Sequence, residues 1–411
     1  MDLPEVRPLR MADPLEDETL FRELTYRFLI WDPFVSGGRR VDLHPLILPR
    51  KLHDAAKRAA ETTVRCIERA ARLAHEEPDE ANVYALHPDV TRLAAASHRA
   101  GDTAALVRVD LLFGQDGNFH PCEINADCPG GFNEAFGLPR LARSAGFLGG
   151  ENPTVVAGQL ARRLATLAAG GTVGLVFATA YAEDLQVCAF IKNRIEALGA
   201  RALFVSPTAP RAAPNGELRM RDGERIDALY RFFPIEYMAG QSNVGDYVRA
   251  VESGKLRTLS SFGQVYAQSK LSFARAWKRD PEGASESRIP ETLDFADITM
   301  ARLIEERASW VVKRAFGRVG DEVWVGALAS ADQWAPLVRA VDACVRRGDS
   351  WIAQRFIPQC TISTVWGPRY LTLGVYVLDG HFVGYFVRLT PDSHVSHDAL
   401  VVPAFIEGTP S

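Results

Sequence analysis

The spacing of apolar and polar residues changes several times along this chain. Ala, Arg and Glu dominate from Leu52 to Ala74, which predicts a helix there, and residues 20–75 as a whole are predicted to be mostly helical. Two stretches of alternating apolar and polar residues follow on either side of Gly114–Asn118. Its Asp-Gly step is typical of a tight turn, so the two stretches are predicted to form a β-hairpin.

The middle of the chain has the pattern of a parallel sheet. An apolar strand is predicted over Thr172–Ala178, a helix over Asp184–Leu198 and a second strand over Ala202–Val205, with Gly199 where the helix should end. A third strand, Ala228–Phe233, follows. Such a βαβ order predicts a parallel sheet with flanking helices. Because the region lacks a GxGxxG motif, it predicts no dinucleotide site.

The last third of the chain mixes helices with shorter strands. The elements predicted there are a helix containing Lys270, a polar loop over Pro281–Pro290, a helix ending at Glu305, strands over Trp310–Lys313 and Val323–Val325, a helix over Ala331–Arg347, a strand over Trp351–Phe356, and a closing hairpin that turns at Asp379-Gly380.

The first hairpin carries the strongest chemical signal. Alternate side chains of a strand share a face, so one surface of the hairpin should display Arg108, Asp110, Glu123, Asn125 and Asp127. Oxygen ligands of this kind suit Mg²⁺, which usually takes one or two carboxylates together with substrate phosphates. The hairpin therefore predicts phosphoryl-transfer chemistry. The alternative is an ordinary solvated sheet face.

A second candidate site follows the strand that ends at Lys313. Desolvating an ammonium group without a partner is costly, and a phosphate would be a suitable partner. The glycines Gly317 and Gly320 would allow backbone N–H groups to approach that phosphate, with Arg314 and Arg318 beside them. A plain hairpin turn is the alternative interpretation.

Composition narrows the class of protein. The chain has 411 residues, 47% of them hydrophobic, so two or three globular domains are expected. A formal net charge of −4 gives no basic surface for nucleic acid. The six cysteines lack metal-ligand spacing and are expected to be free thiols. With no apolar signal segment or membrane span in the sequence, a cytoplasmic location is expected.

Taken together, the motifs resemble a known family. Arg108-x-Asp110, Glu123-x-Asn125-Ala126-Asp127, Asn133-Glu134-Ala135 and Val312-Lys313-Arg314-x-Phe316-Gly317-Arg318-x-Gly320 resemble, in this order, the glutathionylspermidine synthase family of ATP-grasp ligases. The resemblance implies an α/β (α+β) ATP-grasp fold that is circularly permuted, because the acidic cluster precedes the lysines. It further implies three domains: residues 1–165 with the Mg²⁺ hairpin, residues 166–259 as a βαβ preATP-grasp-like substrate domain, and residues 260–411 as the nucleotide lobe.

The resemblance also implies a role for each motif residue. ATP would phosphorylate a carboxylate, and an amine would attack the acyl phosphate. Asp110, Glu123 and Asn125 would bind two Mg²⁺ ions. The phosphates would be bound by Lys270 and Lys313, and covered by a loop containing Gly317, Arg318 and Gly320. Gln354, Phe356 and Ile357 would surround the adenine, and Arg108 and Arg388 would contact the transferred phosphoryl group.

The chain departs from the family where substrate should bind. The family usually has Thr or Ser after Asn-Ala-Asp, whereas this chain has Cys128-Pro129-Gly130-Gly131. Without those hydroxyls we expect small-molecule carboxylate and amine substrates other than glutathione and spermidine, an amino acid or short peptide among them. Two alternatives remain open: a ligase that loads an amino acid on a carrier-protein thiol, and a nucleotide-binding protein without turnover. The sequence leaves open the oligomeric state, the role of Cys128, and whether Asp127 and Arg231 face the substrate.

Overall fold

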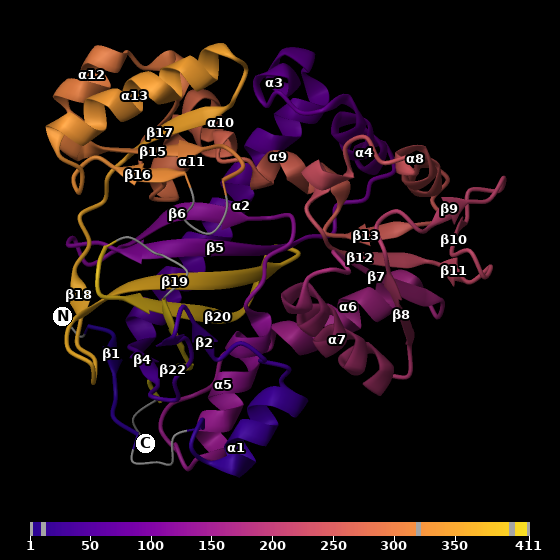
Figure 1. Cartoon of the computed structure of the whole chain (residues 1–411), viewed down its shortest axis with the longest axis horizontal. Coiled ribbons are helices and arrows are strands. Elements are labelled where there is room, and N and C mark those ends of the chain that lie inside the picture. Colours follow the sequence, from indigo (N-terminus) through magenta and orange to yellow (C-terminus); the bar gives the residue numbers. More distant parts are fainter. Residues whose placement is uncertain (1–2, 10–13, 318–321, 394–398, 409–411) are drawn as a thin grey trace.

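A computed structural model describes residues 3–9, 14–317, 322–393 and 399–408. Its central element is an antiparallel sheet in the order β21-β20-β19-β5-β6, with β18 (Thr361–Ile362) paired to β19. Strands from both ends of the chain meet in it (Figure 1): β5 (Leu106–Phe113) and β6 (Phe119–Asn125) lie beside β19 (Arg369–Leu378), β20 (His381–Thr390) and β21 (Leu400–Val402). Both predicted hairpins are confirmed.

The predicted long helix is α2 (Arg50–Glu76), which packs on one face of this sheet, followed by α3 (Pro78–Val83) and α4 (Pro88–Arg99). The helical prediction for residues 20–49 is largely wrong. After α1 (Glu18–Arg22) and one π-helical turn (Glu23–Arg27), the chain forms β2 (Phe34–Val35), β3 (Gly38–Arg39) and β4 (Leu46–Leu48). Prolines at 33, 45 and 49 and the glycine pair at 37–38 interrupt a helix there.

The parallel sheet is confirmed, in the order β13-β12-β7-β8. It consists of β7 (Thr172–Phe177), β8 (Arg201–Val205), β12 (Ala228–Phe232) and β13 (Arg257–Leu259). Around it lie α6 (Val156–Ala168), α7 (Ala182–Ala197) and α8 (Val244–Glu252). Gly199 follows α7 with φ +78°, the left-handed conformation that ends many helices. A small sheet of β9 (Arg211–Ala212), β10 (Leu218–Arg219) and β11 (Arg225–Ile226) projects beyond it (Figure 1).

A third sheet, in the order β14-β17-β15-β16, is antiparallel. Its strands are β14 (Thr292–Asp294), β15 (Trp310–Arg314), β16 (Val323–Val325) and β17 (Trp351–Arg355). Helices α12 (Met300–Glu305) and α13 (Ala331–Arg346) cover it around the buried Trp310 and Trp334. Helix α10 (Leu271–Arg279) begins directly after Lys270. The predicted loop 281–290 in fact begins with a short helix, α11 (Pro281–Glu286), because Asp280 caps its first turn.

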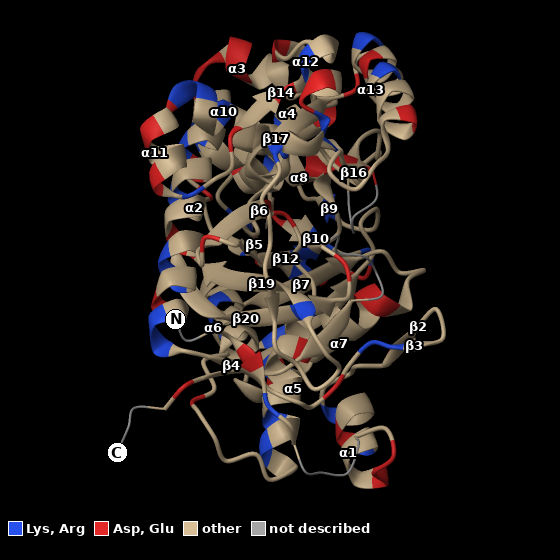
Figure 2. Cartoon of the chain, turned by 90° about the vertical axis from the view of Figure 1, so that its left-hand side faces the viewer, with Lys and Arg blue, Asp and Glu red and all other residues tan. Residues whose placement is uncertain are grey.

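The remaining elements lie beside β4 and β20, and helix α6 crosses one of the predicted domain boundaries. Strands β1 (Glu5–Val6) and β22 (Ala404–Ile406) flank β4, helix α5 (Phe132–Ser144) packs against β20, and α6 runs across residue 165. The three-domain division stays a prediction. Among the described residues no helix is long and apolar enough to span a membrane. In the view of Figure 2, Lys and Arg are interspersed with Asp and Glu along α2, whereas the charged residues of α11 are all acidic.

Candidate active site

A cavity of about 770 Å³ lies where the three sheets approach one another. It is lined by Arg108, Asp110, Glu123, Asn125, Lys270, Lys313, Gln354, Phe356, Ile357 and Arg388, all of which were predicted from the sequence. Gly317 contacts this group through its carbonyl oxygen, and Arg318 and Gly320 lie outside the described residues. The volume is that of a site for a cofactor-sized ligand.

Asp110 is the most strongly held acid in the cavity. Its carboxylate accepts hydrogen bonds from Arg108 (Nε–Oδ1 2.8 Å, Nη2–Oδ2 3.1 Å) and forms an ion pair with Arg388 (Nη2–Oδ2 2.6 Å). Burial alone would raise the pKa of Asp110, but the two guanidinium groups outweigh it and lower the pKa to about 2. Asp110 is therefore ionised throughout the physiological range, as a metal ligand must be.

Glu123 and Lys270 form the second charged pair. Glu123 lies opposite Asp110 in the β5–β6 ladder, and Asn125 lies opposite Arg108. The Glu123 Oε1 atom is 2.9 Å from Lys270 Nζ, which also donates to the carbonyl oxygen of Gly317 at 2.6 Å. Among the described residues no three His, Cys, Asp or Glu side chains gather as a metal site. Two carboxylates and one carboxamide nevertheless form an oxygen donor set that suits Mg²⁺ bound together with phosphates.

The sequence predicted that the partner of the buried Lys313 ammonium group would be a phosphate. In the structure this ammonium group already has two partners within the protein. Its Nζ atom donates to the carbonyl oxygen of Cys122 at 2.9 Å and to Oε1 of Gln354 at 2.7 Å. The other end of the Gln354 amide donates to Thr292 Oγ1 at 3.0 Å, so this side chain holds Lys313 in place. Burial lowers the pKa of Lys313. Arg314 ends the strand and pairs outside the cavity with Glu322 and Asp349.

Asp127 and Arg231 line no part of this cavity. Strand β6 ends at Asn125, and the side chain of Gln268 accepts hydrogen bonds from the next two backbone N–H groups, at 2.8 and 3.0 Å. Asp127 consequently turns into the protein, where it pairs with the fully buried Arg231 and accepts from the Ile235 N–H at 2.9 Å. The pair joins β6 to the end of β12, whereas Cys128 does line the cavity.

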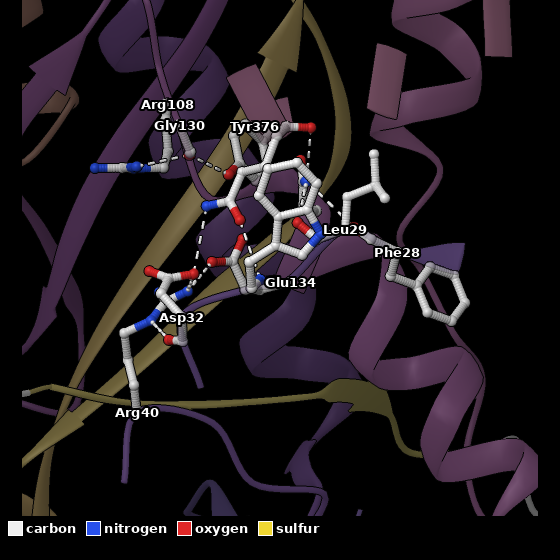
Figure 3. A network of polar contacts seen from close by, with 11 residues as sticks. Phe28, Leu29, Asp32, Arg40, Arg108, Gly130, Glu134 and Tyr376 are labelled. Atoms are coloured by element: carbon white, nitrogen blue, oxygen red, sulfur yellow. Dashed lines mark hydrogen bonds and ion pairs between the residues drawn. The ribbon is translucent and has the colours of Figure 1, made fainter. Parts of the chain in front are cut away.

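The other end of the cavity contains charged residues that the sequence prediction missed. Arg40 donates from Nη2 to Asp32 Oδ1 at 2.9 Å and to Glu134 Oε1 at 2.5 Å (Figure 3). Its Nε atom donates to the Asp32 carbonyl oxygen at 2.8 Å. Gly130, four residues before Glu134, accepts hydrogen bonds from Arg108 and from the Tyr376 hydroxyl. Only Glu134, through the Asn133-Glu134-Ala135 motif, carried any signal in the sequence.

Two further acids lie at this end, in the first turn of α7. Glu183 and Asp184 both line the cavity, near the carboxyl ends of the parallel strands. Burial raises the pKa of Asp184 to about 6, aided by the neighbouring Glu183 and opposed by the Ala178 N–H that donates to it. Together with Asp32 and Glu134, these acids make this end of the cavity net negative despite Arg40.

The chain is similar to several known proteins. The family model for glutathionylspermidine synthase preATP-grasp matches residues 47–407. A solved structure of a glutathione synthetase-like effector from Globodera pallida in its apo form has the same fold, with a TM-score of 0.59 at 12% identity over 95% of this chain and 98% of that one. A gamma-glutamylcysteine synthetase-like protein from Methylobacillus flagellatus matches 81% of this chain and 84% of its own, at 16% identity and a TM-score of 0.40. No curated protein sequence matches significantly.

Proposed function

Because the chain belongs to the glutathionylspermidine synthase preATP-grasp family, we propose that it joins a carboxylate to an amine with the hydrolysis of ATP to ADP and phosphate. The observation that carries the proposal is the pair of charged clusters in one cavity, Asp110 between two arginines and Glu123 with Lys270. A protein that merely binds a nucleotide has no need of this arrangement. The two charged clusters therefore favour an enzyme that turns over ATP, as opposed to a protein that binds a nucleotide without turnover.

The chemistry requires neutralisation of charge on the transferred phosphoryl group. Asp110, Glu123 and Asn125 would hold Mg²⁺, which when bound contributes positive charge beside the phosphates. Lys270 and Lys313 would contact the phosphates directly. Arg108 and Arg388 would exchange part of their contact with Asp110 for the phosphoryl oxygens, and Phe356 and Ile357 would border the adenine.

The acidic end of the cavity would receive a cationic group of the amine substrate. Asp32, Glu134, Glu183 and Asp184 attract a cation, and the walls formed by Phe232 and Phe233 limit access of water to the acyl phosphate. The cavity beside them has Cys128 and Gly130 in place of the family's hydroxyl groups. We therefore propose that glutathione is not the carboxylate substrate.

The test is ADP release measured over a matrix of carboxylates and amines with Mg²⁺, with products identified by mass. A pair that raises ADP release and yields the corresponding amide supports the proposal. Glutathione with spermidine is included, and efficient formation of their conjugate would refute the substrate part. Absence of ADP release with every pair would refute the ligase itself.

Lys313→Met is expected to weaken ATP binding about 10- to 100-fold, because a hydrogen bond from a charged group contributes about 1.5–3 kcal/mol. Calorimetric titration with ATP and Mg²⁺ measures the affinity. Lys313→Arg, which keeps the charge, should recover part of the loss. The exposed Lys255→Met is the control, and an affinity for ATP unchanged in Lys313→Met would remove Lys313 from the nucleotide site.

The pKa of Asp184 near 6 predicts how the amine KM depends on pH. The carboxylate is charged above pH 6 and neutral below it, so the attraction for an ammonium substrate is lost as the pH falls from 7 to 5. A loss of about 1 kcal/mol would raise the KM for the amine roughly fivefold. Steady-state kinetics should show this rise in the wild type and a flatter profile in Asp184→Asn. Identical profiles would exclude Asp184 from amine binding.

A further inference from the structure

Two of the residues at the acidic end of the cavity, Asp32 and Arg40, come from outside the family-matched range. Both flank the β2–β3 hairpin, before residue 47 where the match begins, whereas Glu134 lies within it. We call these three residues the Arg40 clamp. All three line the cavity, and their side chains are 30%, 13% and 8% exposed in the order Asp32, Arg40, Glu134. This end of the cavity is thus built in part by a segment that lies outside the match to the family model.

The clamp is rigidly held. Asn133 donates to the carbonyl oxygens of Phe28 and Leu29, both at 3.2 Å, which ties the segment before Asp32 to helix α5 (Figure 3). Gln186 of α7 donates to Asp32 Oδ1 at 3.3 Å and accepts from the Trp31 N–H at 3.1 Å. Three separate elements therefore fix Asp32 and Glu134 relative to Arg40, which favours binding of a ligand without a large reorganisation.

The clamp also has bonding capacity to spare. Three atoms of the clamp form no hydrogen bond with the described residues: Arg40 Nη1, Asp32 Oδ2 and Glu134 Oε2. The other nitrogen and oxygen atoms of the same guanidinium and carboxylate groups do form hydrogen bonds. Nearby, the buried Asn133 Oδ1 has no partner either. The three residues of the clamp line a cavity of ligand size and have one guanidinium nitrogen and two carboxylate oxygens available for a ligand.

The charges and the donors point to the same kind of ligand. Within the clamp, two carboxylates against one guanidinium leave a net charge of −1. The nearby Glu183 and Asp184 add to it, so this end of the cavity favours an ammonium group. The free N–H of Arg40 requires an acceptor, and a carboxylate is its strongest partner. A ligand with an ammonium group beside a carboxylate satisfies both. A simple diamine would leave Arg40 Nη1 to water, without the charge-assisted hydrogen bond that a carboxylate would supply.

We propose, on the basis of the proposed ligase function, that the Arg40 clamp binds the α-ammonium and α-carboxylate groups of an amino-acid substrate. Arg40 then determines specificity at a distance from the phosphoryl chemistry. The reacting group is at the other end of the substrate, toward Arg108, which contacts Gly130 at 2.9 Å. The substrate class is an α-amino acid whose side chain carries a second amine or carboxylate.

The experiment compares substrates that differ only in the head group. Lysine is paired with 1,5-diaminopentane, ornithine with 1,4-diaminobutane, and glutamate with glutarate and 4-aminobutyrate, each tested for ADP release with a range of co-substrates. We call the analogues that lack the α-carboxylate or the α-ammonium group stripped analogues. At least one amino acid should have a KM at least 10-fold lower than that of its stripped analogue. Stripped analogues that equal or surpass every amino acid would overturn the inference while leaving the ligase proposal intact.

Variants then identify the residue responsible. Arg40→Gln should raise the KM for the amino acid at least 10-fold with little change in the KM for ATP, and Arg40→Lys should recover part of the effect. Arg39→Gln, in the same hairpin but outside the cavity lining, is the matched control. An unchanged KM in a folded Arg40→Gln variant would overturn the inference.

Binding can also be tested without turnover. If no pair of substrates releases ADP, the ligase proposal fails, and calorimetry with lysine, ornithine and glutamate in the presence of a non-hydrolysable ATP analogue tests the clamp alone. Binding of an amino acid that is lost in Arg40→Gln would support the clamp. Absence of binding by all three, or equal binding by both variants, would overturn it.

Discussion

Glu123→Gln is expected to lower ATP-dependent ADP release about 100- to 1,000-fold, the usual effect of removing one group that stabilises transition-state charge. The substitution keeps the shape of the side chain and removes its charge, so both the proposed Mg²⁺ contact and the ion pair with Lys270 are weakened. Because the Glu123 side chain is 25% exposed, the fold should tolerate the change. Single-turnover measurements with ATP would separate the lost chemical step from weaker binding.

A matched control lies on α7. Glu196 forms an ion pair with Lys192 as Glu123 does with Lys270, but on the surface and away from the cavity. Glu196→Gln should leave ADP release unchanged, since exposed pairs contribute little. If the folded Glu123→Gln variant retained the wild-type rate, the proposed metal site on the β5–β6 hairpin would be wrong.

Asp127→Ala is expected to destabilise the protein by about 3–5 kcal/mol, because it leaves the fully buried guanidinium of Arg231 without its counter-charge. The Ile235 N–H loses its acceptor at the same time. Urea denaturation should show a lower transition midpoint with a similar slope. ADP release per folded molecule should change far less than in Glu123→Gln, since Asp127 lies outside the cavity.

Two variants test the electrostatic explanation. Glu252→Ala breaks the exposed pair with Arg99 and should change stability by less than about 1 kcal/mol. Replacing Asp127 and Arg231 together with apolar residues should cost less than the single change, because no buried charge is left unpaired. A single Asp127→Ala variant as stable as the wild type would show that Arg231 finds another partner.

Local patterns allowed much of the fold to be predicted. The Asp-Gly steps located both hairpins, and the run of alanine, arginine and glutamate located α2, because these signals depend on neighbouring residues. The alternation in β6 was less informative. Strict alternation would place Cys122 on the face opposite Glu123. The ladder shifts between Asp110 and Leu111, however, and Cys122 lines the cavity together with Glu123. A bulge of this kind leaves no mark in the period of the sequence.

The missed part of the site depends on long-range contacts. Asp32 and Glu134 are about a hundred residues apart along the chain, and Arg40 hydrogen-bonds to both. No local pattern around Asp32 distinguishes it from a surface acid. Asp127 was misplaced for a related reason. Its position depends on Gln268, which holds the backbone after β6 and turns the next side chain inward. Neither contact could be inferred from spacing alone.

The central sheet has a consequence for synthesis of the protein on the ribosome. β5 and β6 leave the ribosome long before β19 and β20, whose strands supply Arg388 and complete the ladder. Until then the nascent hairpin exposes the unpaired edge of β5, which invites association with other chains. Pairing over so many residues also slows folding. We expect a nascent chain stalled before residue 369 to lack part of the proposed nucleotide site and to depend on chaperones to remain free of aggregation.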